Sequence, residues 1–319
     1  MKHLITLFIL FFAIGAYSQE KHIRFMMFAD LHYDMMPDGA SRLETILQAT
    51  QKKKASFIVN MGDLSAPASA YQPLKDRLDN VSLPLFHVIG NHDTDMGKQT
   101  FMDFFGMKAP YYSVDKGKFR FIFLDSNFFI DKDSQEKDYY KANYTSSKQI
   151  NRYSRQELQW LKQQLETSQI CVLFSHAPIN DGYDKIIDNT EIHQMLVAAR
   201  DKGTPIAAIF GGHIHSDNYH VIDGLHYIQV NSASNIWGGS NFTNTERYPA
   251  ETYKQYSSLK YIIPYKDALY ATVDVYSNGK VKITGTKSSY LAPAPDSEKL
   301  KTKSYPCSPS IQDRKFSYK

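Results

Sequence analysis

The stretch IRFMMFADLH, residues 23–32, joins a continuous apolar run to an acid and a histidine, Asp30 and His32. Four later apolar runs end in a similar way. Their ends are Gly62-Asp63, Gly90-Asn91-His92-Asp93, His176 and Gly211-Gly212-His213-Ile214-His215. An apolar run of this length is typical of a strand buried on both faces. Since ligand sites form at the carboxyl ends of such strands, we expect the five loops to meet in one crevice.

The rest of the chain alternates strand and helix signals. Further strands are expected at 56–60, 85–89, 170–174 and 206–210, and helices at 41–54, 71–80, 154–167 and 190–202. Hairpins are expected at 111–125, 219–230 and 268–286, the last two around Asp-Gly and Asn-Gly turns. Ser41 with Glu44, and Ser154 with Glu157, match the capping box that begins a helix. We therefore predict the α/β class, with two mixed β-sheets packed as a sandwich and helices flanking them.

The two ends of the chain differ in character from its body. Residues 4–14 are apolar and small residues follow at 16–18, which is typical of a cleaved signal peptide over 1–18. This run is shorter than the ~20 residues that span a bilayer, so we expect no membrane span and a periplasmic or extracellular location. We assign 19–292 to a single domain and 293–319 to a loosely ordered basic tail.

The distribution of charge argues against a nucleic-acid partner. The formal net charge is +4, and residues 296–319 hold six basic and three acidic side chains. The body is therefore close to neutral and lacks the basic stripe of a nucleic-acid binder. Two cysteines, Cys171 in an apolar run and Cys307 in the tail, give no sign of a thiol or zinc–cysteine site. Whether they pair, and the oligomeric state, are left open.

Two long segments, 131–151 and 237–265, interrupt the pattern. The second carries Trp237 and several phenylalanines and tyrosines after Gly238-Gly239. Loops of this length are usually lids, binding loops or disordered segments, and the aromatic content argues against disorder. Two roles stay open for 237–265: packing as a small satellite core, or lining a substrate site.

The residue types after the five runs suit metal ions. Asp30 and His32 stand two residues apart, so in extended backbone they point to one side and can hold one ion. His213 and His215 repeat this spacing. Asp63 is the acid best placed to bridge two cations with its two oxygens. A mixed nitrogen and oxygen shell favours manganese, zinc or iron over calcium or magnesium. Two neighbouring metal ions are suited to in-line displacement at phosphorus.

Through these motifs the sequence resembles the calcineurin-like metallophosphoesterase superfamily, over about residues 23–230. The resemblance implies a dinuclear centre, with His92 at the leaving-group oxygen and without a metal contact. It assigns one metal to Asp30, His32, Asp63 and His215, and the other to Asp63, Asn91, His176 and His213. Where purple acid phosphatases of this superfamily carry a tyrosine, this chain has Ala66. That branch is therefore disfavoured.

The function expected from these residues is an exported, metal-dependent phosphoric ester hydrolase that uses a bridging hydroxide. Its small-molecule substrate is expected to be a phosphodiester or a nucleotide-type pyrophosphate, with a phosphomonoester as the alternative. A non-catalytic metal-binding scaffold is the alternative from a different class. Asp93 has two interpretations: a catalytic residue that orients His92, or a hydrogen-bond acceptor for the local turn.

Overall fold

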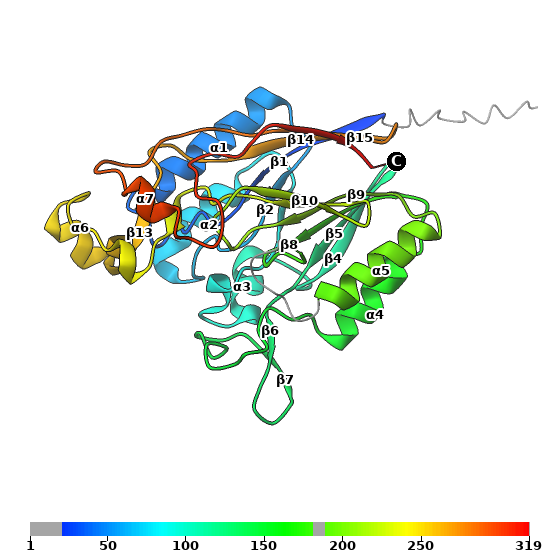
Figure 1. Cartoon of the computed structure of the whole chain (residues 1–319), viewed down its shortest axis with the longest axis horizontal. Coiled ribbons are helices and arrows are strands. Elements are labelled where there is room, and N and C mark those ends of the chain that lie inside the picture. The colour runs from blue at the N-terminus through cyan, green and yellow to red at the C-terminus, as the bar shows by residue number, and fades with distance from the viewer. Residues whose placement is uncertain (1–20, 181–188, 319) are drawn as a thin grey trace, which may run out of the picture.

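Two six-stranded mixed sheets form the centre of the molecule (Figure 1). The computed structural model describes residues 21–180 and 189–318, so the predicted signal peptide over 1–18 lies outside the described residues. The first sheet has the order β16 (Arg314–Ser317), β15 (Lys280–Thr284), β14 (Ala271–Tyr276), β1 (His22–Phe28), β2 (Ile58–Asn60), β3 (Leu85–His87). The second has the order β10 (Asn218–Ile222), β11 (Leu225–Gln229), β9 (Ile206–Gly211), β8 (Ile170–Ser175), β5 (Phe119–Leu124), β4 (Tyr112–Lys116). The predicted fold class is confirmed.

Helices cover the outer face of each sheet. Helices α1 (Gly39–Lys53) and α2 (Gln72–Asp79) pack on the first sheet, and α4 (Arg155–Gln164) and α5 (Asn189–Asp201) pack on the second. Between the sheets lies an aromatic core in which Phe25, Phe121 and Phe174 are buried and in edge-to-face or stacked contact. Strands that are covered on both faces must be apolar throughout, which explains the continuous apolar runs of the sequence.

Parallel strands bring the five loops together. Strands β1, β2 and β3 are mutually parallel in the first sheet, and β5, β8, β9 and β11 are parallel in the second. The loops that follow β1, β2, β3, β8 and β9 carry the expected site residues. Backbone bonds join neighbouring loops: Asp30 N–H donates to the Gly62 carbonyl at 3.0 Å, and Gly212 N–H donates to the His176 carbonyl at 2.8 Å.

One of the two predicted capping boxes is wrong. Helix α1 begins at Gly39, with Asp38 at the N-cap, so Ser41 lies inside the first turn. The carboxylate of Asp38 pairs with the buried guanidinium of Arg42 one turn later at 2.8 Å, and Arg42 in turn donates to the distant carbonyls of Ala233 and Tyr265. The second box is half confirmed, because Ser154 accepts the Glu157 N–H at α4 whereas the Glu157 carboxylate accepts from a distant backbone group.

The two long segments have their own structure. Residues 131–151 follow β6 (Phe128–Ile130) and contain β7 (Glu136–Asp138). The aromatic segment runs through β12 (Asn235–Trp237), η3 (Ser240–Phe242), α6 (Ala250–Gln255), η4 (Ser257–Tyr261) and β13 (Ile262–Pro264). Leu259 and Ile262 pack with Met36 against Tyr248 and Tyr253, so a satellite core is present.

The prediction of a loosely ordered tail is contradicted. The tail contains α7 (Ser297–Leu300), and β16 pairs antiparallel with β15 at the edge of the first sheet. Ile311 is buried in the central core, and Arg314 forms a bidentate ion pair with Asp217 at 2.9 and 2.7 Å. The composition of the tail is that of a solvated segment because its strand is an edge strand, half of which faces water.

The remaining described elements are short: η1 (Ser69–Tyr71), η2 (His92–Thr94) and α3 (Lys98–Phe105). Within the described ranges, every helix is too short or too polar to cross a lipid bilayer.

Candidate metal centre

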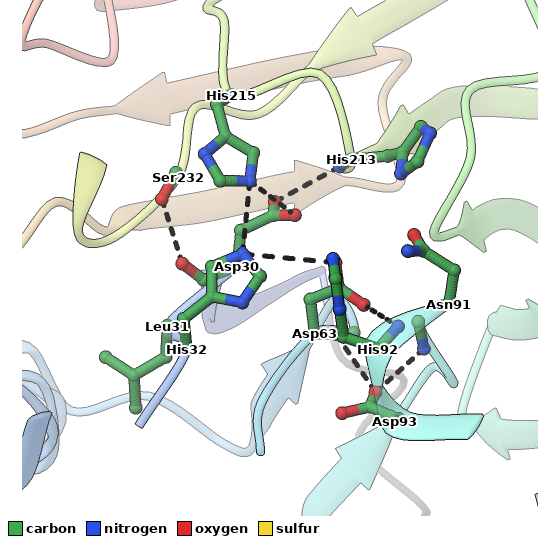
Figure 2. A network of polar contacts seen from close by, with 12 residues as sticks. Asp30, Leu31, His32, Asp63, Asn91, His92, Asp93, His213, His215 and Ser232 are labelled. Carbon is green, nitrogen blue, oxygen red and sulfur yellow. Dashed lines mark hydrogen bonds and ion pairs between the residues drawn. The ribbon is translucent and has the colours of Figure 1, made fainter. Parts of the chain in front are cut away.

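The structure brings the predicted ligands together as two adjacent groups (Figure 2). One group consists of Asp30, His32 and His215, and the other of Asp63, His176 and His213. Within each group the ligand atoms lie within 4.8 Å of one another. The sequence resemblance implied a similar division, but it placed Asp63 in both groups and added Asn91 to the second.

Hydrogen bonds fix how two of the histidines face the site. Nδ1 of His176 lies 2.9 Å from the Met61 carbonyl, and Nδ1 of His215 lies 2.8 Å from the Asn235 carbonyl. A carbonyl only accepts, so Nδ1 carries a proton in both rings, and Nε2 is the nitrogen left for a metal ion. This is the arrangement in which outer hydrogen bonds orient metal-binding imidazoles.

Asp63 lies between the two groups, as expected, but with one oxygen rather than two. Its Oδ1 accepts the backbone N–H of His92 at 2.8 Å. Its Oδ2 lies 3.4 Å from Nε2 of His176 and 3.9 Å from Nε2 of His32. Oδ2 is therefore the Asp63 oxygen that faces ligand atoms of both groups.

Three further observations fit a pair of cations. Oδ1 of Asp30 is buried and has no hydrogen-bond partner among the described residues. Nε2 of His32 faces Nε2 of His215 at 3.2 Å, so two imidazole nitrogens are available to one cation. Oδ1 of Asn91 lies 3.2 Å from Nε2 of His176, so the amide oxygen points into the second group. The donors are the nitrogen and oxygen atoms that manganese, zinc and iron accept.

The backbone at the ligands is unusual. Five of the predicted ligands adopt positive φ: Asp30 (52°), His32 (48°), Asp63 (52°), His213 (71°) and His215 (54°). Gly62 also has positive φ, and a Cβ there would lie 2.6 Å from Nδ1 of His176. A Cβ on Gly90 would collide with the backbone nitrogen and carboxylate of Asp63. Only glycine allows the loops to approach this closely.

Charge within the site is balanced among carboxylates and histidines. Burial would lower the pKa of His176, but the carboxylates of Asp63 and Asp30 outweigh it and raise that pKa to about 10. Burial lowers the pKa of His32 to about 3 and that of His213 to about 4. Without metal, a proton on His176 thus supplies part of the missing positive charge. Metal binding must release this proton, so metal affinity falls as pH falls.

His92 lies beside the ligand groups and is not one of their members. Its ring is 5.4 Å from the ring of His32, and its Nδ1 is 3.7 Å from the carboxylate of Asp95. Burial would lower the pKa of His92, but Asp63 and Asp95 raise it to about 9. The ring is half-exposed and faces the cavity, which suits a proton donor.

Asp93 has a different role from that of His92. Its Oδ2 accepts the backbone N–H groups of Asp63 at 2.9 Å and Gly90 at 2.8 Å. Its Oδ1 accepts those of Leu64 at 2.9 Å and Ser65 at 3.3 Å. The carboxylate therefore ties two site loops together, and the prediction that it orients His92 gives way to the hydrogen-bonding alternative.

Three residues at the site lie outside the predicted set. Tyr144 accepts the Asn91 amide N–H at 3.1 Å and so orients its carbonyl oxygen. Trp237 and Tyr305 line the cavity of about 250 Å³ that contains His32, Asp63 and other site residues. Tyr144 and Trp237 belong to the two long segments already noted, but no motif in the sequence marked Tyr305.

Comparisons with known proteins also indicate a metal-dependent phosphoesterase. Residues 23–217 match the family model for calcineurin-like phosphoesterases. A dimetal phosphatase from Danio rerio is similar in structure, with a TM-score of 0.57, 15% identity, and coverage of 93% of this chain and 99% of that one. GAP50, described as the anchor in the inner membrane complex of Plasmodium, has a TM-score of 0.54, 14% identity and coverage of 94% and 90%. No curated protein sequence matches this chain.

Proposed function

Because the chain belongs to the calcineurin-like phosphoesterase family, and is thereby a hydrolase of phosphoester bonds, we propose that it cleaves small phosphodiesters or nucleotide-type pyrophosphates with two bound metal ions. The observation that carries this proposal is the position of Asp63 Oδ2, which belongs to one ligand group and also faces His32 of the other. One carboxylate oxygen shared by two such groups is suited to a pair of neighbouring cations.

Different residues of the site would hold the cations and transfer the proton. Asp30, His32 and His215 would hold one cation, and Asp63, Asn91, His176 and His213 the other. When bound, the cations supply Lewis acidity that polarises the phosphoryl group and acidifies water. His92 would donate a proton to the departing oxygen, and its contact with the Asp95 carboxylate favours the protonated ring. Asp95 contacts Nδ1 of His92 at 3.7 Å.

The dimensions of the site support a small substrate. The cavity over the ligands measures about 250 Å³, below the roughly 300–1,000 Å³ of sites that enclose a drug-sized molecule. It accepts a phosphoryl group, while the organic groups of the ester extend past Trp237 and Tyr305. Aromatic rings at this position favour esters with flat organic groups over a bare phosphate ion.

The test is hydrolysis by the purified protein with added manganese, zinc or iron. Para-nitrophenyl phosphate, bis-para-nitrophenyl phosphate and a nucleotide diphosphate sugar are compared side by side. We expect the diester or the pyrophosphate to be cleaved faster than the monoester, and Asp63→Ala to lose both bound metal and activity. Substitution of the exposed His22 by alanine is the matched control and keeps both. Faster cleavage of the monoester assigns a phosphomonoesterase, and bound metals without hydrolysis assign a scaffold.

We also propose that the protein is exported through cleavage of residues 1–18, on the sequence pattern described above. Expression of the full chain followed by N-terminal sequencing of the exported product tests this. We expect a mature protein that begins at Gln19, and retention of the full chain inside the cell contradicts it.

A further inference from the structure

A second cavity lies next to the metal centre and is built by the C-terminal segment. It measures about 710 Å³, and its walls include Tyr290, Leu300, Lys303 and Tyr305. Tyr305 also lines the cavity over the predicted metal ligands, so the two cavities share one wall residue. A volume of this size matches sites that enclose small organic molecules, which span roughly 300–1,000 Å³.

The segment that forms this cavity is anchored to the body of the protein. Ser216 donates its hydroxyl to the Pro306 carbonyl at 2.6 Å. The side-chain amide of Asn231 donates to the carbonyls of Ser308 at 2.7 Å and Ser310 at 3.0 Å. Lys299 of α7 lies 5.1 Å from the ring of Phe242 in the aromatic segment. The walls of the cavity are therefore held in place by contacts with the body of the protein.

Lys303 gives this cavity its charge. Its ammonium group donates to the Trp237 carbonyl at 2.8 Å and lies 5.2 Å from the ring of Tyr305. No carboxylate pairs with it among the described residues, and none lines the cavity. The ammonium of Lys301, by contrast, is held by Glu298 in an exposed ion pair. Two of the three Lys303 N–H donors thus remain for a ligand.

Burial strengthens this assignment. Lys303 is partly covered, and desolvation lowers the pKa of its ammonium group. A cation that has lost water without gaining an anion binds an incoming anion more strongly than an exposed lysine does. Lys303 therefore contacts two residues, Trp237 and Tyr305, that line the cavity over the predicted metal ligands.

Resting on the proposed function, we propose that the second cavity binds the organic group of the substrate and that Lys303 pairs with a further anionic substituent on it. The substrate class is then a phosphoester whose organic group is flat and carries a carboxylate or a second phosphate. The metal ligands would select the phosphoryl group, and the C-terminal segment would select the molecule to which it is attached.

A matched pair of esters tests the inference: para-nitrophenyl benzyl phosphate and para-nitrophenyl 4-carboxybenzyl phosphate. They share a leaving group and differ by one carboxylate. We expect kcat/KM to favour the carboxybenzyl ester by about fivefold, the size of one ion pair at a partly exposed site. Lys303→Ala should bring the ratio of the two values close to one, and Lys303→Arg should retain it. Lys299→Ala, which removes a nearby charge that does not line the cavity, should leave the ratio as in the wild type.

Binding of unreactive analogues separates this inference from the proposed function. Benzylphosphonate and 4-carboxybenzylphosphonate are titrated into the metal-loaded protein by calorimetry. Tighter binding of the carboxylated compound that Lys303→Ala abolishes supports the subsite even if neither ester is hydrolysed. Equal hydrolysis of the two esters, or equal affinity for the two phosphonates, overturns the subsite and leaves the proposed function intact.

Discussion

Replacement of Asp93 by alanine should loosen the metal centre without touching a predicted ligand. The carboxylate accepts four buried backbone N–H groups, those of Asp63, Leu64, Ser65 and Gly90. An unsatisfied buried donor costs about 1–3 kcal/mol. If water enters the space that alanine leaves, the lower figure applies, and the four groups together cost about 4 kcal/mol. Metal affinity should also fall about 10- to 100-fold, as for outer-sphere substitutions at metal sites.

The assay is urea unfolding of the chelator-treated protein, together with metal titration of the folded protein. Asp93→Asn keeps one acceptor oxygen but turns an NH₂ group toward two of the four donors, so about half of the loss in unfolding free energy is expected. Asp95→Ala is the control, because this neighbouring acid contacts His92 and joins no loops. If Asp93→Ala unfolds within 1 kcal/mol of the wild type and changes only the pH profile of hydrolysis, then Asp93 acts on His92 and our reasoning is wrong.

Three other substitutions test separate parts of the site and fold. His92→Ala should keep both metals but lower kcat at least about 100-fold on an ester with a poor leaving group. The loss of kcat should be smaller on a para-nitrophenyl ester, and equal losses on both esters contradict proton donation. Tyr144→Phe should weaken metal binding about tenfold by freeing the Asn91 amide, whereas exposed Tyr140→Phe should not, as metal titration will show. Burial lowers the pKa of His87 to about 4 from its usual 6.5, so the folded protein holds fewer protons than the unfolded chain between these values. Stability should therefore fall as pH drops through this window, by about 3 kcal/mol in total. His87→Gln should lack this component in urea unfolding measured from pH 7 to pH 4, and an unchanged pH dependence would refute it.

Much of the fold was predictable because the signals are local. The buried run of β1 and the Asn-Gly turn between β14 and β15 need no distant partner to be recognised. The start of α1 was not predictable in this way, since Arg42, which pairs with Asp38, is held by the distant carbonyls of Ala233 and Tyr265. Strand β16 was missed for a related reason: its residues are charged or polar on one face, and only pairing with β15 makes it a strand.

The predicted ligands gather because strand order places the ends of β1, β2, β3, β8 and β9 at one edge, and glycine-rich turns mark these ends in the sequence. The residues that orient or surround them have no such mark. Tyr144 reaches Asn91 from 53 positions away, and Tyr305 reaches the cavity from the tail. A tyrosine in a polar segment resembles any surface tyrosine until the fold brings it to a site. For Asp93 the sequence left two roles open, orientation of His92 and acceptance of local hydrogen bonds. Its four backbone hydrogen bonds favour the second role.

The left-handed backbone of the five predicted ligands lowers the thermal stability of this protein, although the metal site requires these residues. Residues other than glycine hold such angles at a cost of roughly 1 kcal/mol each, so the site lowers the stability of the fold by roughly 5 kcal/mol. Selection for melting temperature alone would favour glycine at these positions and would discard the ligands with it. Laboratory evolution of a heat-resistant form must therefore screen hydrolysis in every round, and should take its gains from the outer faces of α4 and α5.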